Sequence, residues 1–495
     1  DLVNAARRKG STLITLRSGQ ANILDPLLAI LSADALDLVA LPLRNRREEV
    51  IGVLCLLYRG QPGSRDMPRQ DGHIAFVQAL SGFAAVSLES RHLLMMQEAL
   101  LDAFIKLIAG AIDSKSPYTG GHCQRVPEIT RMLATAACES NAPPFRGFQL
   151  DKQQWEALDI ASWLHDCGKV TTPEYVVDKS TKLETIYDRI HEIRMRFEVL
   201  KRDAEIHFWE QLAEGGDRTA LRQSLDAELQ QLDEDFAFVA GCNEGGEFMA
   251  ADKVERLQQI AERSWLRTLD DRLGISWEEA ARKGRAEPSP LPATERLLDD
   301  KLEHLIERSG SDRMAVDNPW GFRLDVPEYK YNRGELYNLC VARGTLTVEE
   351  RYQINDHIVQ TIIMLEKLPY PGHLRDVPLI AGCHHETMDG KGYPRRLTGD
   401  EMPLTARMMA IADIFEALTA SDRPYKKART LSEAIRIMNF MRQDRHIDPD
   451  LFELFLSSGI YLEYGRRFLQ PDQLDAVDVS DYLGVPGQRQ QLPGK

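Results

Sequence analysis

Histidine and aspartate residues gather at three places in the sequence. Residues 384–394 read HHETMDGKGYP, a histidine pair that runs into a loop with two glycines. The stretch WLHDCGKV places His165 next to Asp166, and His122 follows the turn PYTGG. Imidazole and carboxylate groups together are the ligands expected for transition metals such as Mn, Fe, Zn or Ni. The three places therefore predict a metal site.

Two metal ions about 3.5–4 Å apart can clamp a phosphodiester and deprotonate a water between them. Asp166 has two oxygens and can bridge two ions, whereas His165 can hold one. Lys169 follows Asp166 by one helical turn, so its ammonium projects from a similar side and can bind a phosphate oxygen. A single histidine on a helix is more often a packed or surface residue. The combination of motifs, and not any one of them, indicates phosphodiester hydrolysis.

The motifs HDCGK, HHETMDGKGYP and ARMMAIADIFEALTASDRPYKKA follow one another along the chain. In this order they resemble the HD-GYP family of metal-dependent phosphodiesterases, over residues 101–183 and 344–445. The resemblance implies an all-helical bundle that hydrolyses cyclic di-GMP to linear pGpG, or on to GMP, with two or three metal ions. Two alternatives remain: another substrate, such as cyclic GMP-AMP or a nucleotide, or a catalytically idle signalling scaffold.

The resemblance also implies which residues hold the metal ions. One ion takes the histidine after the turn PYTGG, the histidine and the aspartate of HDCGK, and the aspartate of the last motif. Asp166, the aspartate of HDCGK, bridges to the second ion. The second ion takes the histidine pair and one further histidine. The first set is His122, His165, Asp166 and Asp413, and the second begins with His384 and His385.

Two stretches compete to supply the further histidine. TKLETIYDRIHEIR offers His191, and GTLTVEERYQINDH offers His357. In the family pattern the histidine stands thirteen residues after a leading glycine, and this count from Gly344 reaches His357. We therefore expect His357 to be the ligand. Two ions are expected, because Tyr118 stands where members with three ions supply a glutamate. Iron or manganese is the expected metal, with nickel, zinc or magnesium as alternatives.

The expected reaction is attack on phosphorus by a hydroxide that bridges both ions, in line with the leaving 3′-oxygen. Asp166 and Lys169 are the predicted catalytic residues, and no covalent nucleophile is implied for Cys167. The predicted substrate contacts are Lys169, Gly392, Tyr393, Arg423 and Lys426. Simple packing is the alternative role for Tyr393, and solvated surface charge is the alternative for Arg423 and Lys426.

The elements that position these residues are predicted to be mainly helical. Residues 37–60 have the pattern of a β-hairpin, and apolar residues at three- and four-residue intervals predict a helix over 73–113. Residues 1–95 resemble part of an α/β GAF sensor domain. Residues 96–115 are expected to form a connector helix through which two copies of the chain would dimerise. The catalytic domain is expected to span 116–183 and 344–470, and the tail 471–495.

Between the two catalytic segments, residues 184–343 are expected to form a long helical insertion. Three charged stretches, 186–212, 220–236 and 294–310, have helical patterns separated by breaks with glycine and proline. A solvated helical projection is the simplest interpretation. A protein partner for the insertion, and control of the site by a sensed signal, are further expectations.

Composition excludes some classes of function. The 495 residues carry a net charge of −15, which disfavours general binding to a nucleic-acid polymer. Seven scattered cysteines without a CxxC pair favour a reducing compartment, and we expect a cytoplasmic location. No apolar run approaches the roughly 20 residues of a membrane-spanning helix. Because the sequence begins at Asp1, a piece of a longer protein is expected.

Overall fold

The computed structural model describes residues 12–17, 30, 32, 35–59, 71–115, 121–246, 248–315, 317–420 and 428–483. The chain divides into two compact units, Asp1–Phe104 and Ile105–Lys495, called here the N-terminal and C-terminal units. Helices make up most of the described residues, and the predicted mainly helical fold is confirmed. Within the described ranges, no helix is both long enough and apolar enough to cross a membrane.

The N-terminal unit contains an antiparallel sheet with the strand order β1-β2-β3. The predicted hairpin is confirmed, because β2 pairs with β3 from Leu36↔Arg59 to Arg44↔Val50. In the turn, the side chain of Asn45 accepts hydrogen bonds from the backbone N–H groups of Arg47 and Glu49. The resemblance of this unit to a GAF domain stays a prediction. The strands are β1 (Thr12–Arg17), β2 (Ala35–Arg44) and β3 (Val50–Arg59).

A long helix, α3 (Asp71–Asp113), follows the sheet and agrees with the helix predicted over 73–113. Its last turns belong to the C-terminal unit, where Ile105, Ala109 and Ile112 are buried in the core. The division between the units therefore falls inside α3, about nine residues after the predicted boundary at residue 95.

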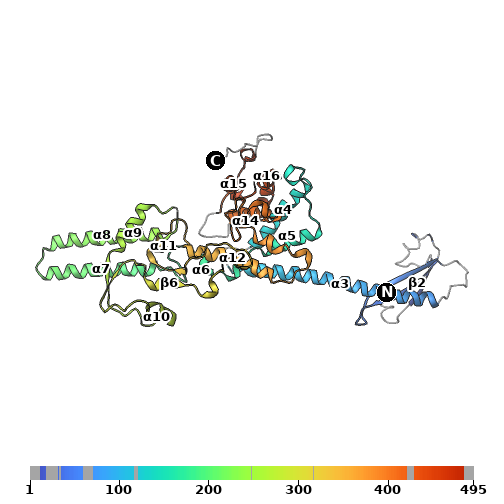
Figure 1. Cartoon of the computed structure of the whole chain (residues 1–495), viewed down its shortest axis with the longest axis horizontal. Helices are drawn as coiled ribbons and strands as arrows, with labels where there is room; N and C mark the ends of the chain where they lie inside the picture. The colour runs from blue at the N-terminus through green and yellow to red at the C-terminus, as the bar shows by residue number, and fades with distance from the viewer. Residues whose placement is uncertain are drawn as a thin grey trace. The chain divides into compact units, whose positions relative to one another are not determined.

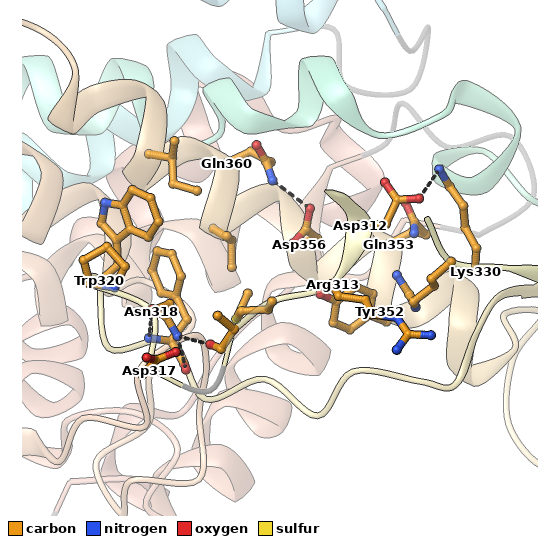
Figure 2. A pocket seen from close by; sticks show the side chains of 17 residues that line it. Asp312, Arg313, Asp317, Asn318, Trp320, Lys330, Tyr352, Gln353, Asp356 and Gln360 are labelled. Atoms are coloured by element: carbon orange, nitrogen blue, oxygen red, sulfur yellow. Dashed lines mark hydrogen bonds and ion pairs between the residues drawn. The ribbon is translucent and has the colours of Figure 1, made fainter. Parts of the chain in front are cut away.

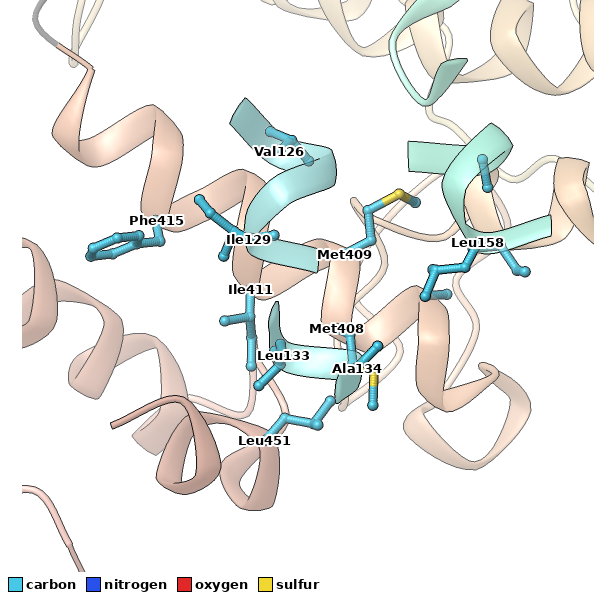
Figure 3. Packing of buried hydrophobic residues seen from close by; sticks show 14 of the residues in the cluster. Val126, Ile129, Leu133, Ala134, Leu158, Met408, Met409, Ile411, Phe415 and Leu451 are labelled. Carbon is cyan, nitrogen blue, oxygen red and sulfur yellow. The ribbon is translucent and has the colours of Figure 1, made fainter. Parts of the chain in front are cut away.

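A bundle of helices forms the larger part of the C-terminal unit. Figure 3 shows Ile129 and Leu133 of α4 beside Met408 and Ile411 of α14 in its apolar core. All four side chains are fully buried, which gives the helices that carry the histidines a fixed support. The helices are α4 (His122–Glu139), α5 (Lys152–Leu164), α6 (Glu174–Val177), α12 (Val348–Glu366), α13 (Val377–Gly382), α14 (Leu404–Thr419), α15 (Leu431–Gln443), α16 (Pro449–Ser457) and α17 (Ile460–Phe468).

The segment between α6 and α12 has an apolar core of its own. Its two longest helices, α7 and α8, lie side by side as an antiparallel pair (Figure 1). Two small antiparallel sheets of two strands each follow, in which β4 pairs with β5 and β6 pairs with β7. The elements are α7 (Ile190–Ala213), α8 (Arg218–Asn243), α9 (Ala251–Ala261), β4 (Ser264–Arg267), α10 (Trp277–Lys283), β5 (Ala293–Arg296), β6 (Leu305–Glu307), β7 (Tyr329–Asn332) and α11 (Glu335–Leu339).

Residues 294–310 do not form the predicted helix, so this prediction is wrong. Residues 293–296 pair with β4 instead, and 305–307 pair with β7. The adjacent side chains of Leu297 and Leu298 are both fully buried in the core of the insertion. The backbone N–H of Leu297 donates to the carbonyl of Arg263 at 2.7 Å. Partners distant in sequence thus overrule a local helical pattern.

The predicted start of the C-terminal tail, residue 471, lies too early in the chain. Gln473 is buried, and its amide donates to the carbonyls of Thr419 and Arg429 at 2.8 and 2.9 Å. Asp475 accepts a hydrogen bond of 2.9 Å from the backbone N–H of Ser432. Residues 471–483 are therefore part of the bundle, and residues 484–495 lie outside the described ranges.

A buried ion pair joins the chain just before the insertion to α12. The ammonium of Lys179 lies 2.7 Å from a carboxylate oxygen of Glu350, and both side chains are buried. Glu350 also accepts from the backbone N–H of Thr347 in the capping box at the start of α12. The pair therefore fixes the first turn of the helix that carries His357.

Replacing Lys179 by Met is expected to lower the free energy of unfolding by about 3 kcal/mol or more, because the Glu350 carboxylate stays buried without its partner. The control is Lys201→Met, which breaks a partly exposed pair with Asp233 and should cost less than about 1 kcal/mol. Urea unfolding followed by circular dichroism measures both. Equal stability of the two variants would contradict the role of the buried pair.

Candidate metal centre

The predicted ligands come from six elements of the bundle. His122 is the first residue of α4, and Asp413 lies on α14. His165 caps the end of α5, and Asp166 follows it at the start of a short 3₁₀ helix, η2 (Cys167–Thr171). His357 lies on α12, and the histidine pair follows directly after α13. Helix ends supply most of the set, so their side chains can converge from different directions.

The structure brings all seven predicted ligands together in two clusters. Within each cluster the nitrogen and oxygen atoms that can bind metal all lie within 4.8 Å of one another. The competing His191 is exposed on α7, where its ring contacts Arg194, and it belongs to neither cluster. The clusters are His122, His165, Asp166 and Asp413, and His357, His384 and His385.

Asp166 lies between the two clusters, with one oxygen toward each. Its Oδ2 lies 3.2 Å from Nε2 of His122 and 3.3 Å from Nε2 of His165. Its Oδ1 lies 3.1 Å from Nε2 of His357 and 3.9 Å from Nε2 of His384. This is the geometry of a carboxylate that can bridge two ions, as the sequence predicted.

Backbone carbonyls orient three of the imidazole rings. The Nδ1 atoms of His165, His357 and His384 donate to carbonyls three residues earlier in the chain, at 2.8, 2.5 and 2.7 Å. In a neutral ring this arrangement leaves Nε2 without a proton and available to bind metal. Burial alone would lower the pKa of His165, but the charge of Asp166 outweighs it and raises the pKa to about 9. Burial lowers the pKa of His384 to about 4 and that of His385 well below its usual value, so both rings are neutral.

Several atoms at the centre are buried hydrogen-bond acceptors without a hydrogen-bond donor. They are Oδ1 of Asp166 and Nε2 of His357 and His384. Lone pairs that face each other at 3.1 Å in a buried site repel unless a cation lies between them. The donor set, of imidazole nitrogen and carboxylate oxygen without sulfur, suits Mn, Fe or Zn. The residues present therefore fit a pair of metal ions.

Sequence reasoning missed a residue that holds His122. Nδ1 of His122 hydrogen-bonds to Oε2 of Glu416, and the other Glu416 oxygen lies 2.6 Å from the guanidinium of Arg125. Glu416 is buried and follows Asp413 by three residues on α14. That spacing puts the two carboxylates on one face of the helix. It was the feature of the sequence from which the role of Glu416 could have been predicted.

The short helix η2 packs tightly on α12. The backbone N–H of Gly168 donates to the hydroxyl of Thr361 at 2.8 Å. A Cβ atom at Gly168 would lie 1.9 Å from the carbonyl oxygen of His357, so glycine is required there. This contact sets the distance between Asp166 and His357.

The predicted catalytic Lys169 contacts the bridging carboxylate. Its ammonium lies 2.5 Å from Oδ2 of Asp166. Burial by itself would lower the pKa of Lys169, but the charges of Asp166 and Asp413 outweigh it and raise the pKa, so the side chain is cationic. Burial raises the pKa of the neighbouring Cys167 thiol to about 11, which agrees with the absence of a covalent nucleophile in the expected reaction.

The loop after the histidine pair folds back over the site. The ring of Tyr393 stacks on that of His385, with centroids 4.8 Å apart and planes 19° apart. The backbone N–H of Tyr393 donates to the carbonyl of His385 at 3.1 Å. The buried carboxylate of Glu386 accepts from the backbone N–H groups of Arg395 and Leu397. Tyr393 thus packs on a predicted metal ligand, and its substrate contact stays a prediction.

The two glycines of the loop serve the loop's own conformation. Gly390 has a φ of +75°, which glycine adopts without strain. Gly392 is buried, and a Cβ atom there would lie 2.4 Å from Cα of Glu386. At Gly392 the chain itself makes the close approach, and the substrate contact of this glycine stays a prediction. Arg423, Lys426 and Tyr118 lie outside the described residues.

A separate cavity of about 460 Å³ lies against a different face of α12 (Figure 2). Its lining includes Asp356 and Gln360 of α12, and Trp320 and Phe322, whose rings stack with centroids 5.8 Å apart. None of the seven predicted metal ligands lines it. The metal centre is therefore not in this cavity.

Comparison with known proteins agrees with this geometry. Residues 292–451 match a family described as the HD domain. The matched region includes His357, His384, His385 and Asp413, whereas the predicted ligands from α4 and the end of α5 lie before it.

Relatives of the chain are named as cyclic dinucleotide phosphodiesterases. A 3′3′-cGAMP-specific phosphodiesterase 3 of Vibrio cholerae is 39% identical over 111 residues, 22% of this chain and 23% of the relative. A 3′3′-cGAMP-specific phosphodiesterase 2 of the same organism is 49% identical over 77 residues, 16% and 14% of the two chains. A cyclic di-GMP phosphodiesterase of Pseudomonas aeruginosa is 47% identical over 91 residues, 17% and 21%. The chain spans less than a quarter of the length of each of these three relatives.

Metal analysis of purified variants tests the two clusters. We expect about two transition-metal ions per chain in the parent protein, about one in Asp413→Ala and in His385→Ala, and fewer than one in Asp166→Ala. His191→Ala changes a histidine outside both clusters and should keep the parent content. Inductively coupled plasma mass spectrometry after metal loading measures the content. A parent protein that takes up no metal would contradict the assignment.

Proposed function

We propose that this chain is a metal-dependent phosphodiesterase that hydrolyses cyclic di-GMP to linear pGpG, or on to GMP. The observation that carries the proposal is the position of Asp166, with one carboxylate oxygen toward each of two clusters of potential metal ligands. The names of the relatives, cyclic di-GMP and 3′3′-cGAMP phosphodiesterases, support the same class of substrate.

Two divalent ions are proposed as the cofactor, with iron or manganese first and nickel, zinc or magnesium as alternatives. When bound, such a pair supplies Lewis acidity toward the phosphoryl oxygens and lowers the pKa of a water between the ions. The proposed holders of the ions are the seven residues of the two clusters.

The chain's own residues orient the substrate and exclude water. His165 and Asp166 are buried, so electrostatic interactions at the centre are stronger than in bulk water. The ammonium of Lys169 projects beside Asp166 and is proposed to bind a phosphoryl oxygen, where it offsets the negative charge that builds up during cleavage. Water adds its hydroxyl group to phosphorus and its proton to the leaving 3′-oxygen, which gives a 5′-phosphate and a free 3′-hydroxyl.

Cyclic GMP-AMP is the second candidate substrate. The reason is specific: two of the relatives described above are named as 3′3′-cGAMP-specific. An idle scaffold is a weaker alternative, since every predicted ligand is present and lies in one of the clusters. Control by a sensed signal, a protein partner for the insertion and a cytoplasmic location stay predictions.

Hydrolysis of cyclic di-GMP by protein loaded anaerobically with Mn(II) or Fe(II) tests the activity. We expect Asp166→Ala to lower kcat at least about a hundredfold, since even residues that support a ligand contribute 10–100-fold. Asp159→Ala is the matched control, because Asp159 lies on the preceding helix and pairs with Arg131 at the surface. Chromatography distinguishes pGpG from GMP. A metal-loaded parent without activity on cyclic di-GMP and cyclic GMP-AMP would contradict the proposal.

We also propose that two copies pair through α3. Large apolar side chains recur on this helix at spacings of three, four, seven or eleven residues, all of them sums of threes and fours, and are exposed, as on the seam of a coiled coil. They are Phe76, Leu80, Phe83, Leu94, Leu101 and Phe104.

Light scattering after size-exclusion chromatography is expected to give a dimer for the parent protein. The double substitution Leu94→Glu and Leu101→Glu should give a monomer, because two charges would be buried in the seam. Met95→Glu is the control, since Met95 is exposed on the same helix but outside the seam. A monomeric parent, or a dimer in all three proteins, would exclude this interface.

A further inference from the structure

A second cavity, of about 400 Å³, lies between the insertion, α12 and the loop after the histidine pair. Its lining includes Arg323 from the insertion, Arg351 and Asn355 from α12, and Tyr393 and Arg396 from the loop. None of these residues except Tyr393 was a predicted site residue. The size is sufficient for part of a small ligand.

The end of the insertion is bound to the loop by three contacts. The backbone N–H of Arg323 donates to the carbonyl of Pro394 at 2.7 Å, and the guanidinium of Arg396 lies 2.8 Å from Asp325. The guanidinium of Arg395 donates to the carbonyl of Trp320 at 2.9 Å. These contacts fix the backbone of Arg323 relative to the loop, so the insertion contributes a side chain to the cavity at a set place.

The charge of the cavity is positive and partly uncompensated. Arg396 is paired with Asp325, and Lys391 with Asp389. Across the described part of the chain, the guanidinium groups of Arg323 and Arg351 make no hydrogen bond or ion pair, and both residues are exposed. In a chain with a net charge of −15, two unpaired arginines on one cavity form a local site for an anionic or acceptor-rich ligand.

The cavity adjoins the metal centre. Tyr393, which lines the cavity, stacks on His385 of the second cluster. No metal ligand of the two clusters lines the cavity, so the ring of Tyr393 is the link between the two sites among the lining residues.

We propose that this cavity is the subsite for the nucleotide that is not being cleaved, and that Arg323 and Arg351 bind the acceptor atoms of that nucleotide. The inference rests on the proposed function. A cyclic dinucleotide has two phosphodiesters and two bases, and the metal centre engages one phosphodiester. The other half offers an anionic phosphate and, in guanine, the O6 and N7 acceptors that arginine binds with two hydrogen bonds. The insertion thereby becomes part of the substrate site.

Steady-state kinetics of Arg323→Ala and Arg351→Ala test the subsite. Each variant is expected to raise KM for cyclic di-GMP about tenfold or more while kcat changes much less, because the lost contact is made equally in the ground state and in the transition state. Arg323→Lys, which keeps the charge, should recover part of the loss. Arg202→Ala removes the same charge from an exposed position on α7 and should keep the parent KM.

The choice of substrate distinguishes the two kinds of contact. A loss of affinity that is larger for cyclic di-GMP than for cyclic di-AMP, which contains no guanine, assigns the arginines to a guanine, since adenine lacks the O6 acceptor. An equal loss for both ligands assigns them to the second phosphodiester. Either result supports the subsite, and a parent-like KM in both alanine variants overturns it.

Equilibrium binding separates failure of this inference from failure of the proposed function. Calorimetry with cyclic di-GMP is run on the metal-loaded parent and on both alanine variants, whose metal content must equal that of the parent. Weaker binding by the variants supports the subsite even where the parent has no turnover. Equal binding by parent and variants, with hydrolysis intact, contradicts the subsite and leaves the proposed function standing. A parent that neither binds nor hydrolyses cyclic dinucleotides contradicts both the subsite and the proposed function.

Discussion

The structure of the site depends on an electrostatic conflict around one carboxylate. Oδ1 of Asp166 faces Nε2 of His357 at 3.1 Å in a buried site, and both atoms are acceptors. Such a contact is unfavourable without a cation between the atoms. The surrounding chain nevertheless holds it in place, through the carbonyl that orients His357 and the contact of Gly168 with α12. The apolar core beneath these helices supplies the stability that this arrangement costs.

Helix α12 connects the parts of the molecule that the sequence separates. Its first turn is capped by Thr347 and joined by the pair Lys179–Glu350 to the chain just before the insertion. Further along, it presents His357 to the metal centre and Arg351 to the second cavity. The end of the insertion then returns to the loop after the histidine pair, where Arg323 contacts Pro394. Although 160 residues separate the two catalytic segments in the predicted domain plan, the chain before the insertion and the end of the insertion both contact elements of the site.

The metal ligands were predictable because their chemistry is local in the sequence. His165 and Asp166 are adjacent, as are His384 and His385, and the count of residues from Gly344 chose His357 over His191. Residues that support the ligands were harder to find. Glu416 carried a weak signal, its spacing from Asp413 on α14. Arg323 carried none, since a single arginine in a charged insertion is indistinguishable from surface charge.

The sequence by itself determined the helical class of the fold, the hairpin β2–β3, the bounds of α3 to within two residues and the ligand types of the centre. These follow from periodicity and from side-chain chemistry, which are properties of short segments. Only the tertiary structure decided that residues 293–296 and 305–307 are strands, that residues 471–483 pack on the bundle, and that Arg323 lines a cavity beside Tyr393. Each depends on a partner distant in the chain, and a local pattern carries no information about that partner.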